Sequence, residues 1–104
     1  MTDPGAQGEI WRIRTVAGMQ FSVVIVDSDA VARLRPSILC ARVREAREVP
    51  PSLELLTVRL PGDYVIAVHD IAALPKDYFI TRQARLTEAS LEELKVALRA
   101  RFDL

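Results

Sequence analysis

Arg42, Arg44 and His69 are the side chains of this sequence that are best suited to chemistry. Arg42 and Arg44 are two residues apart in a β-rich run, so in an extended strand both guanidinium groups point to the same side. There they could stabilise a phosphate, or they could be the solvated end of a strand. His69 is the only histidine, and histidine is the side-chain type that ordinarily titrates near neutrality, which suits proton transfer. Asp70 could orient it, although a surface histidine at a strand end is the simpler interpretation.

A second group of side chains, near the start of the chain, could hold a polyanion. Arg12 and Arg14 share one face of the alternating residues 8–14 and form either a cationic surface or the polar side of an edge strand. Trp11 and Phe21 could stack on bases, as in single-strand binders, although such side chains are more often core residues. The net charge is zero, from 14 basic and 14 acidic residues, so any polyanion site must be local.

The carboxylates and the thiol suggest no cofactor site. Asp27 and Asp29 follow a hydrophobic run and could act as a base, but acidic residues in that place are typically turn formers. One histidine, one cysteine and scattered carboxylates lack the spacing of metal ligands, so we expect no metal and no other cofactor. Cys40 lies in an apolar run, which predicts an inert core thiol.

The length and composition predict a single ordered domain. A chain of 104 residues, of which 50% are hydrophobic, can bury an ordinary core without disulfides. We expect residues 1–7 to be a flexible lead and residues 8–104 to form the domain. Because the sequence has neither a signal peptide nor a membrane-spanning apolar stretch, we expect a cytoplasmic protein with no membrane partner.

Residues 21–29, FSVVIVDSD, should form the central strand of the domain. Four consecutive β-branched residues closed by turn formers are typical of a strand buried on both faces. Further strands are predicted at residues 8–14, 37–43, 53–60, 64–68 and 78–86, with an exposed loop at 44–51 and a connector at 69–76. A helical turn is predicted at residues 29–35. The chain should end in an amphipathic helix capped by Thr87 or Ser90, with Leu91, Leu94, Leu98 and Phe102 on one stripe.

Strands with short turns followed by one helix are typical of a small antiparallel α+β barrel with the helix laid over one side. In so small a barrel, one helix leaves part of the apolar strand surface uncovered. A second copy of the chain could bury that surface, which favours a homodimer.

A series of short motifs runs along the chain in a characteristic order: Gly8-Glu9-Ile10-Trp11, the Val-rich strand ending in Asp29, Leu53-Glu54-Leu55, Tyr64-Val65-Ile66, Asp70-Ile71, Leu74-Pro75-Lys76, and Leu86 before a Leu-bearing helix. From about residue 8 to residue 104 this order resembles the MazF/PemK toxins of type II toxin–antitoxin modules. The resemblance implies an SH3-like or CcdB-like barrel, a homodimer, a neutralising antitoxin, and metal-independent cleavage of single-stranded RNA at short motifs. We expect RNA binding at Trp11, Arg12, Arg14 and Gln20, because Arg12 and Arg14 lie near the loop that overhangs the RNA groove in that family.

Both positions at which the family has its catalytic side chains depart from the family pattern. Members usually open the central strand with Arg-Pro, whose Arg is a principal catalytic residue, where this chain has Phe21-Ser22. The next strand usually ends in a catalytic Thr or Ser, where this chain has Val43, between Arg42 and Arg44.

Three hypotheses about function follow. In the first, the chain is a MazF-like endoribonuclease in which Arg42, Arg44 or Arg12 stabilises the phosphate and Ser22 or His69 assists proton transfer. In the second, it is a catalytically retired binding module that holds an antitoxin peptide or RNA. In the third, it is a CcdB-like toxin acting on a protein target.

Overall fold

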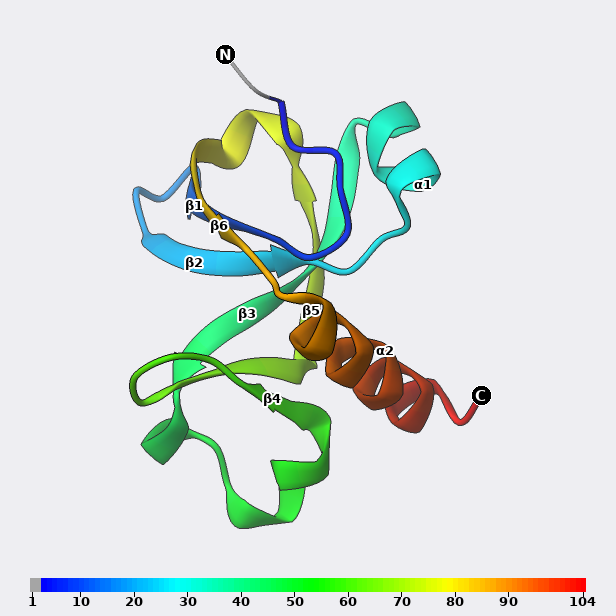
Figure 1. Ribbon diagram of the computed structural model, residues 1–104. Coiled ribbons are helices and arrows are strands. Elements are labelled where there is room, and N and C mark those ends of the chain that lie inside the picture. Colours follow the sequence, from blue (N-terminus) through cyan, green and yellow to red (C-terminus); the bar gives the residue numbers. More distant parts are fainter. Residues whose placement is uncertain (1–2) are drawn as a thin grey trace.

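The computed structural model describes residues 3–104, which form one antiparallel sheet and two α-helices (Figure 1). The strands are β1 (Glu9–Arg14), β2 (Gln20–Ile25), β3 (Ser37–Glu45), β4 (Thr57–Arg59), β5 (Tyr64–Pro75) and β6 (Phe79–Arg85). The α-helices are α1 (Asp29–Leu34) and α2 (Glu88–Phe102), and short 3-10 helices η1 (Ala46–Glu48), η2 (Pro51–Leu56) and η3 (Lys76–Tyr78) lie between strands. The strand order is β4-β5-β3-β2-β1-β6.

The predicted antiparallel sheet with a C-terminal helix is confirmed. The sheet is strongly curled in Figure 1, but no pairing between the edge strands β4 and β6 is found within residues 3–104, so it is not a closed barrel. No helix in this part of the chain is long and apolar enough to cross a membrane.

Strand β2 lies near the middle of the sheet and is buried on both faces, as its continuous β-branched run predicts. Val23 and Val24 are 1% and 0% exposed. Val24 belongs to a hydrophobic cluster that includes Leu94 of α2, whereas Val23 belongs to a second cluster with Trp11 and Ile38. Successive side chains of a strand point to opposite faces, so one strand supplies both clusters.

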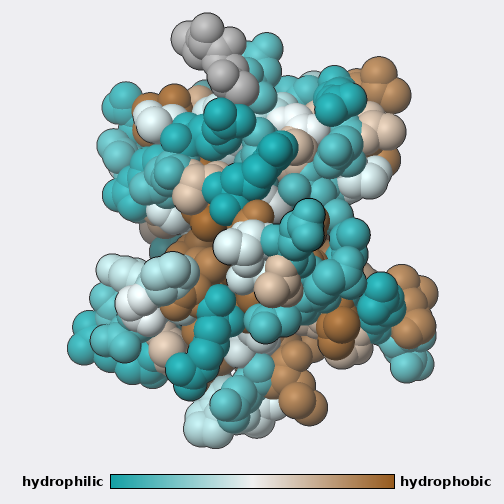
Figure 2. Space-filling model, viewed as in Figure 1, coloured by the Kyte–Doolittle hydropathy of each residue, from teal (hydrophilic) through white to brown (hydrophobic). Residues whose placement is uncertain are grey.

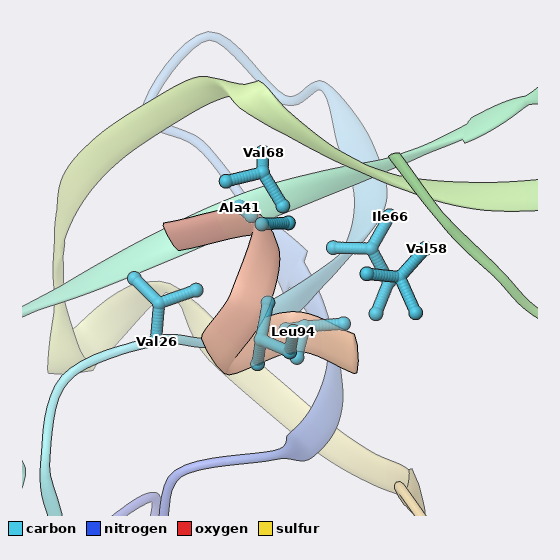
Figure 3. Packing of buried hydrophobic residues seen from close by; sticks show 8 residues of the cluster. Val26, Ala41, Val58, Ile66, Val68 and Leu94 are labelled. Atoms are coloured by element: carbon cyan, nitrogen blue, oxygen red, sulfur yellow. The ribbon is translucent and has the colours of Figure 1, made fainter. Parts of the chain in front are cut away.

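The first cluster lies between α2 and the strands β2 to β5 (Figure 3). Leu94 is fully buried there and packs with Val58 and Ile66. Thr87 caps the helix, because its hydroxyl oxygen accepts a hydrogen bond from the Ser90 amide at 3.1 Å. The middle of the predicted apolar stripe, at Leu94, therefore packs in the core.

The end of α2 does not follow the predicted stripe. Phe102 is 51% exposed, and Val96 and Leu104 are also largely exposed. Hydrophobic surface is visible near this end of the helix in Figure 2, within a surface that is hydrophilic over most of the same view.

The predictions for residues 53–60 and 69–76 were wrong. The expected strand over residues 53–60 is mostly the 3-10 helix η2, and β4 keeps only three residues. Pro51 begins η2, and proline at that position favours a helical turn. The expected connector at residues 69–76 is the second half of β5, which continues through residue 75 and pairs with β3.

A bulge explains why β5 does not read as one strand in the sequence. Ala41 of β3 pairs with Ile71, but the next residue, Arg42, pairs with Ala67, so three residues of β5 are unmatched. The bulge breaks the alternation of hydrophobic and polar residues, which is the signal that predicts a strand. It also places His69 at a bend of the sheet.

The first described residues are held by Glu9, which is 3% exposed. Its carboxylate accepts hydrogen bonds from the amides of Gly5 and Ala6 and from Trp11 Nε1, and it forms an ion pair with Arg82 at 3.1 Å. Burial by itself raises the pKa of a carboxyl group, but these hydrogen bonds outweigh it and lower the pKa of Glu9. Residues 1–2 lie outside the described residues, and flexibility of residues 1–7 stays a prediction.

Replacing Glu9 with glutamine should destabilise the fold by about 1–3 kcal/mol near neutrality, because the negative charge is lost and one of the two acceptor oxygens becomes an NH2 donor that faces other donors. A lowered folded-state pKa means that this contribution is present above the unfolded-state pKa and is lost as pH falls through the folded-state pKa. Urea unfolding of both proteins should therefore show a difference that shrinks in acid. An exposed control, Glu92→Gln, should show neither effect, and a difference independent of pH would contradict the assignment.

Candidate functional site

Arg42 lies on β3 between Val23 of β2 and Ala67 of β5. Its guanidinium carbon is 4.1 Å from the centroid of the Phe21 ring, which is cation–π geometry. The Nε atom is buried and has no hydrogen-bond partner, and within residues 3–104 Arg42 forms no ion pair. A partly buried cation without a counter-charge is available to an anion from outside the chain.

Arg44 is on the same face of β3, but carboxylates already hold it. Its Nε and Nη2 atoms donate to Asp70 Oδ2 at 3.1 and 2.9 Å, and its Nη1 atom is 3.8 Å from Glu48 Oε2. Arg42 and Arg44, which the sequence analysis grouped as one cationic site, therefore differ in charge environment. Arg42 keeps its charge free, whereas the charge of Arg44 is largely compensated.

His69 lies in the β5 bulge, close in register to Arg42, which pairs with Ala67. Its Nδ1 atom is buried and has no hydrogen-bond partner, while its backbone carbonyl accepts a hydrogen bond from Arg101 of α2 at 3.1 Å. Asp70 does not orient the imidazole as the sequence suggested, because its carboxylate accepts hydrogen bonds from Arg44 instead. The bulge thus contains a buried ring nitrogen that has no hydrogen-bond partner within residues 3–104.

Ser22 belongs to a different surface. It lies between Phe21 and Val23 on β2, so its side chain points to the face opposite theirs. Its hydroxyl donates to Gln83 Oε1 at 2.7 Å, and it pairs across the strands with Arg12. The structure therefore separates Ser22 from Arg42.

A polar strip extends this second surface along the β1–β2 hairpin; it consists of Arg12, Arg14, Gln20 and Ser22. Arg14 pairs with Gln20 as Arg12 pairs with Ser22, so all four side chains share a face. Neither arginine forms an ion pair within residues 3–104. The strip carries two uncompensated positive charges.

Trp11 is a core residue and is not presented to a ligand, since it is 3% exposed. Its ring meets Phe79 edge-on, with centroids 5.7 Å apart. Asp27 and Asp29 act as turn formers, because their carboxylates accept hydrogen bonds from the backbone amides of Leu39 and Gln7. These three side chains are engaged in the fold.

No group of three potential metal ligands occurs within residues 3–104. Cys40 is 2% exposed, and burial, with a smaller contribution from Asp27, raises the pKa of its thiol to about 12. The predicted inert thiol matches this environment.

The sequence pointed to the cation Arg42, but it did not indicate the residues that contact the candidate site residues. Phe21 as a support for Arg42 depends on the pairing of β2 with β3, which spacing alone does not give. Gln83 lies 61 residues from Ser22 in the chain, and nothing in the sequence around it indicates the contact.

The chain was compared with known proteins by sequence. No family model matches it. It is 32% identical over 96 residues to a protein named "Probable endoribonuclease MazF2" from two strains of Mycobacterium tuberculosis, and the match covers 90% of this chain and 94% of that protein.

Solved structures share the fold at lower identity. An endoribonuclease from a mycobacterial species, solved in complex with its cognate antitoxin, has a TM-score of 0.82 at 18% identity and covers 97% of each chain. The toxin MazF-mt6 of Mycobacterium tuberculosis has a TM-score of 0.76 at 16% identity over 92% of this chain and 97% of that one. A MazE–MazF structure from Deinococcus radiodurans has a TM-score of 0.77 at 15% identity over 100% of this chain and 99% of that one.

Proposed function

This chain belongs to the MazF family of endoribonuclease toxins, and we propose that it cleaves single-stranded RNA with Arg42 as the cation at the scissile phosphate. In the family pattern, the catalytic arginine opens the strand that is β2 here, at the position of Phe21. The Arg42 guanidinium carbon lies 4.1 Å from the centroid of the Phe21 ring. The neighbouring strand therefore supplies a positive charge close to the place where the family has one.

The lack of a counter-charge on Arg42 is the single observation that carries this proposal. An arginine that served only the fold would be expected to use its donors on carboxylates or carbonyls, as Arg44 does with Asp70. Arg42 has no such partner, and because its Nε is buried, the charge of the guanidinium and its Nη donors are what is left for a phosphate.

The proposed reaction begins with attack of a ribose 2′-oxygen on the adjacent phosphorus. The O2′–P bond forms while the P–O5′ bond breaks, which gives a 2′,3′-cyclic phosphate and a 5′-hydroxyl end. The 2′-hydroxyl proton leaves to a base, and a proton is delivered to the departing O5′. Arg42 stabilises the added negative charge on the phosphate oxygens. His69 is the candidate for proton transfer, because its strand is paired with that of Arg42. Its Nδ1 is buried, so Nε2 is the atom that would exchange a proton with RNA.

The polar strip of Arg12, Arg14, Gln20 and Ser22, on the sheet face opposite to Arg42, is the candidate surface for RNA that continues from the cleavage site around the end of β2. Its two uncompensated arginines suit phosphate contacts that position the strand without reading its sequence. In this proposal Ser22 contacts RNA rather than transferring protons, because Gln83 already accepts its hydroxyl hydrogen.

Incubation of the purified protein with a long RNA in EDTA, with cut sites mapped by primer extension, tests the activity. We expect discrete cuts at one short motif and cyclic phosphate ends. Intact RNA that the protein nevertheless binds would contradict cleavage and support a retired binding module.

The proposed partners are a cognate antitoxin, RNA and a second copy of the chain. Relatives of this fold were solved with antitoxins, one with its cognate antitoxin and one as MazE–MazF. Exposed Val96, Phe102 and Leu104 leave apolar surface that a partner could cover. Light scattering at only the monomer mass of 11.6 kDa would contradict the dimer. With RNA as substrate, we propose the cytoplasm as the site of action.

A further inference from the structure

A cavity of about 320 Å³ lies at the end of the sheet away from α1, between the segment that carries η1 and η2 and the β4–β5 hairpin. In Figure 1 this segment is the wide loop that projects from the lower end of the sheet. Pro50, Leu60 and Val65 contribute apolar walls. The volume falls within the range of small-molecule sites, which is about 300–1,000 Å³.

Four polar residues that line this cavity have side chains that make no contact needed by the fold; they are Glu54, Arg59, Asp63 and Tyr64. None of them forms a side-chain hydrogen bond or ion pair within residues 3–104, although the backbone carbonyls of three of them accept hydrogen bonds. Elsewhere the carboxylates of Glu9, Asp27 and Asp70 are all paired. Two carboxylates, a guanidinium and a phenol gathered around one cavity with free polar atoms suit a ligand that has both donors and acceptors.

Tyr64 gives the cavity a flat aromatic wall. It is 50% exposed at the first position of β5, and the turn residue Gly62 lies against its ring, since a Cβ added there would be 3.6 Å from Tyr64 Cδ2. Gly62 has a φ of 77°, so a glycine suits this turn for its backbone conformation as well. An exposed tyrosine beside a hydrogen-bonding wall is the arrangement by which proteins stack and read an unpaired base.

We propose that this cavity binds a guanine base of the RNA, stacked on Tyr64 and read by Asp63. Guanine is the base that presents two adjacent N–H donors on its Watson–Crick edge, which a carboxylate accepts together. Arg59 supplies a donor for the guanine carbonyl or for the neighbouring phosphate. This inference rests on RNA being the ligand of the proposed function.

The cavity lies within reach of the proposed cleavage site along the sheet. Tyr64 pairs with Glu45, three residues beyond Arg42 on β3, and a strand advances roughly 3.3 Å per residue, so the backbone separation along β3 is about 10 Å. Because this separation is an odd number of residues, the two side chains point to opposite faces of the sheet, and an RNA strand bound to both must pass around this end of the sheet. A short single strand can span that distance. The cavity would then fix one base of the cleavage motif relative to the cut.

Nucleotide titrations followed by amide NMR test the cavity without any need for cleavage. Of the 5′-monophosphates of guanosine, adenosine, cytidine and uridine, we expect the guanosine compound to bind most tightly and to shift the amides of Gly62, Asp63 and Tyr64. Tyr64→Leu should weaken its binding about 10-fold or more, in line with stacking worth about 1–3 kcal/mol per base. Asp63→Asn should remove the preference for guanine.

Matched controls keep the outcome specific. Leu55→Ala, at an exposed η2 position outside the cavity lining, and Asp77→Asn, on a distant carboxylate, should change neither affinity nor preference. Equal binding of all four nucleotides, or shifts confined to residues around Arg42, would overturn the proposal.

Cleavage mapping separates this inference from the proposed function. If the protein cuts RNA, one position of its motif should be guanine, and Tyr64→Leu should relax that position without removing cleavage. If it does not cut, the proposed function fails, and the NMR titration still decides the cavity. A cleavage motif with no guanine at any fixed position would overturn the inference while leaving the activity intact.

Discussion

Arg42→Ala should lower the rate of RNA cleavage by about 10²–10³-fold, the loss typical of removing one group that stabilises charge in a transition state. The guanidinium is the uncompensated cation beside Phe21, and alanine leaves no charge there. The effect should appear in the rate of the chemical step under single turnover with saturating enzyme, so that weaker RNA binding does not account for it. Arg42→Lys should recover only part of the rate, because an ammonium group lacks the planar, bidentate donor geometry of guanidinium.

Arg44→Ala is the matched control on the same strand face. Because Asp70 and Glu48 already compensate the charge of Arg44, its removal should lower the rate far less than the removal of Arg42. Circular dichroism should show that both variants are folded. A larger loss in Arg44→Ala than in Arg42→Ala would reverse the assignment of the catalytic cation.

Leu94→Ala should reduce the free energy of unfolding by about 2–5 kcal/mol. Leu94 is fully buried and is the leucine through which α2 packs on Val58 and Ile66 (Figure 3). The truncation removes the favourable burial of the side chain and leaves a cavity that the sheet can only partly fill. Chemical denaturation followed by far-UV circular dichroism measures the change.

Val96→Ala, two residues further along α2, separates burial from helix effects. Val96 is 59% exposed, so its truncation should change stability by less than about 0.5 kcal/mol. A comparable loss in both variants would mean that the stability of α2 itself, rather than its packing, dominates.

The fold could be predicted where local pattern and burial agree. The β-branched run at residues 23–26 gave a strand buried on both faces, and the spacing of leucines after Thr87 gave α2. The order of motifs gave the family, which the comparisons support.

The sequence could not predict the places where tertiary pairing overrides local pattern. Strand β5 bends at a bulge whose three extra residues make its second half resemble a connector. Residues 53–56 are apolar enough for a strand, yet the prolines before them begin a 3-10 helix. In β5 the long-range partner, rather than the local residue preference, determines the conformation, whereas in residues 53–56 the local prolines outweigh the apolar pattern.

The candidate site also has features that could be predicted from the sequence and features that could not. Arg42 could be named from its residue type and strand position, because an arginine near a strand end is a recognisable cation. Its distinction from Arg44 could not be made, because that depends on Asp70 lying 26 residues away in the chain. The contact of Trp11 with Phe79 depends in the same way on the pairing of β1 with β6, although a core position for Trp11 is the more common expectation for its residue type.

The supply of two hydrophobic clusters by the same strands has a thermodynamic consequence. Strands β2 and β3 each send alternate side chains into both clusters, so neither cluster can come apart without pulling on the strands that hold the other. The protein should therefore lose both clusters in one cooperative transition, with equal calorimetric and van't Hoff enthalpies, and no half-melted form should accumulate. Such coupling leaves few partly folded states from which the protein could aggregate.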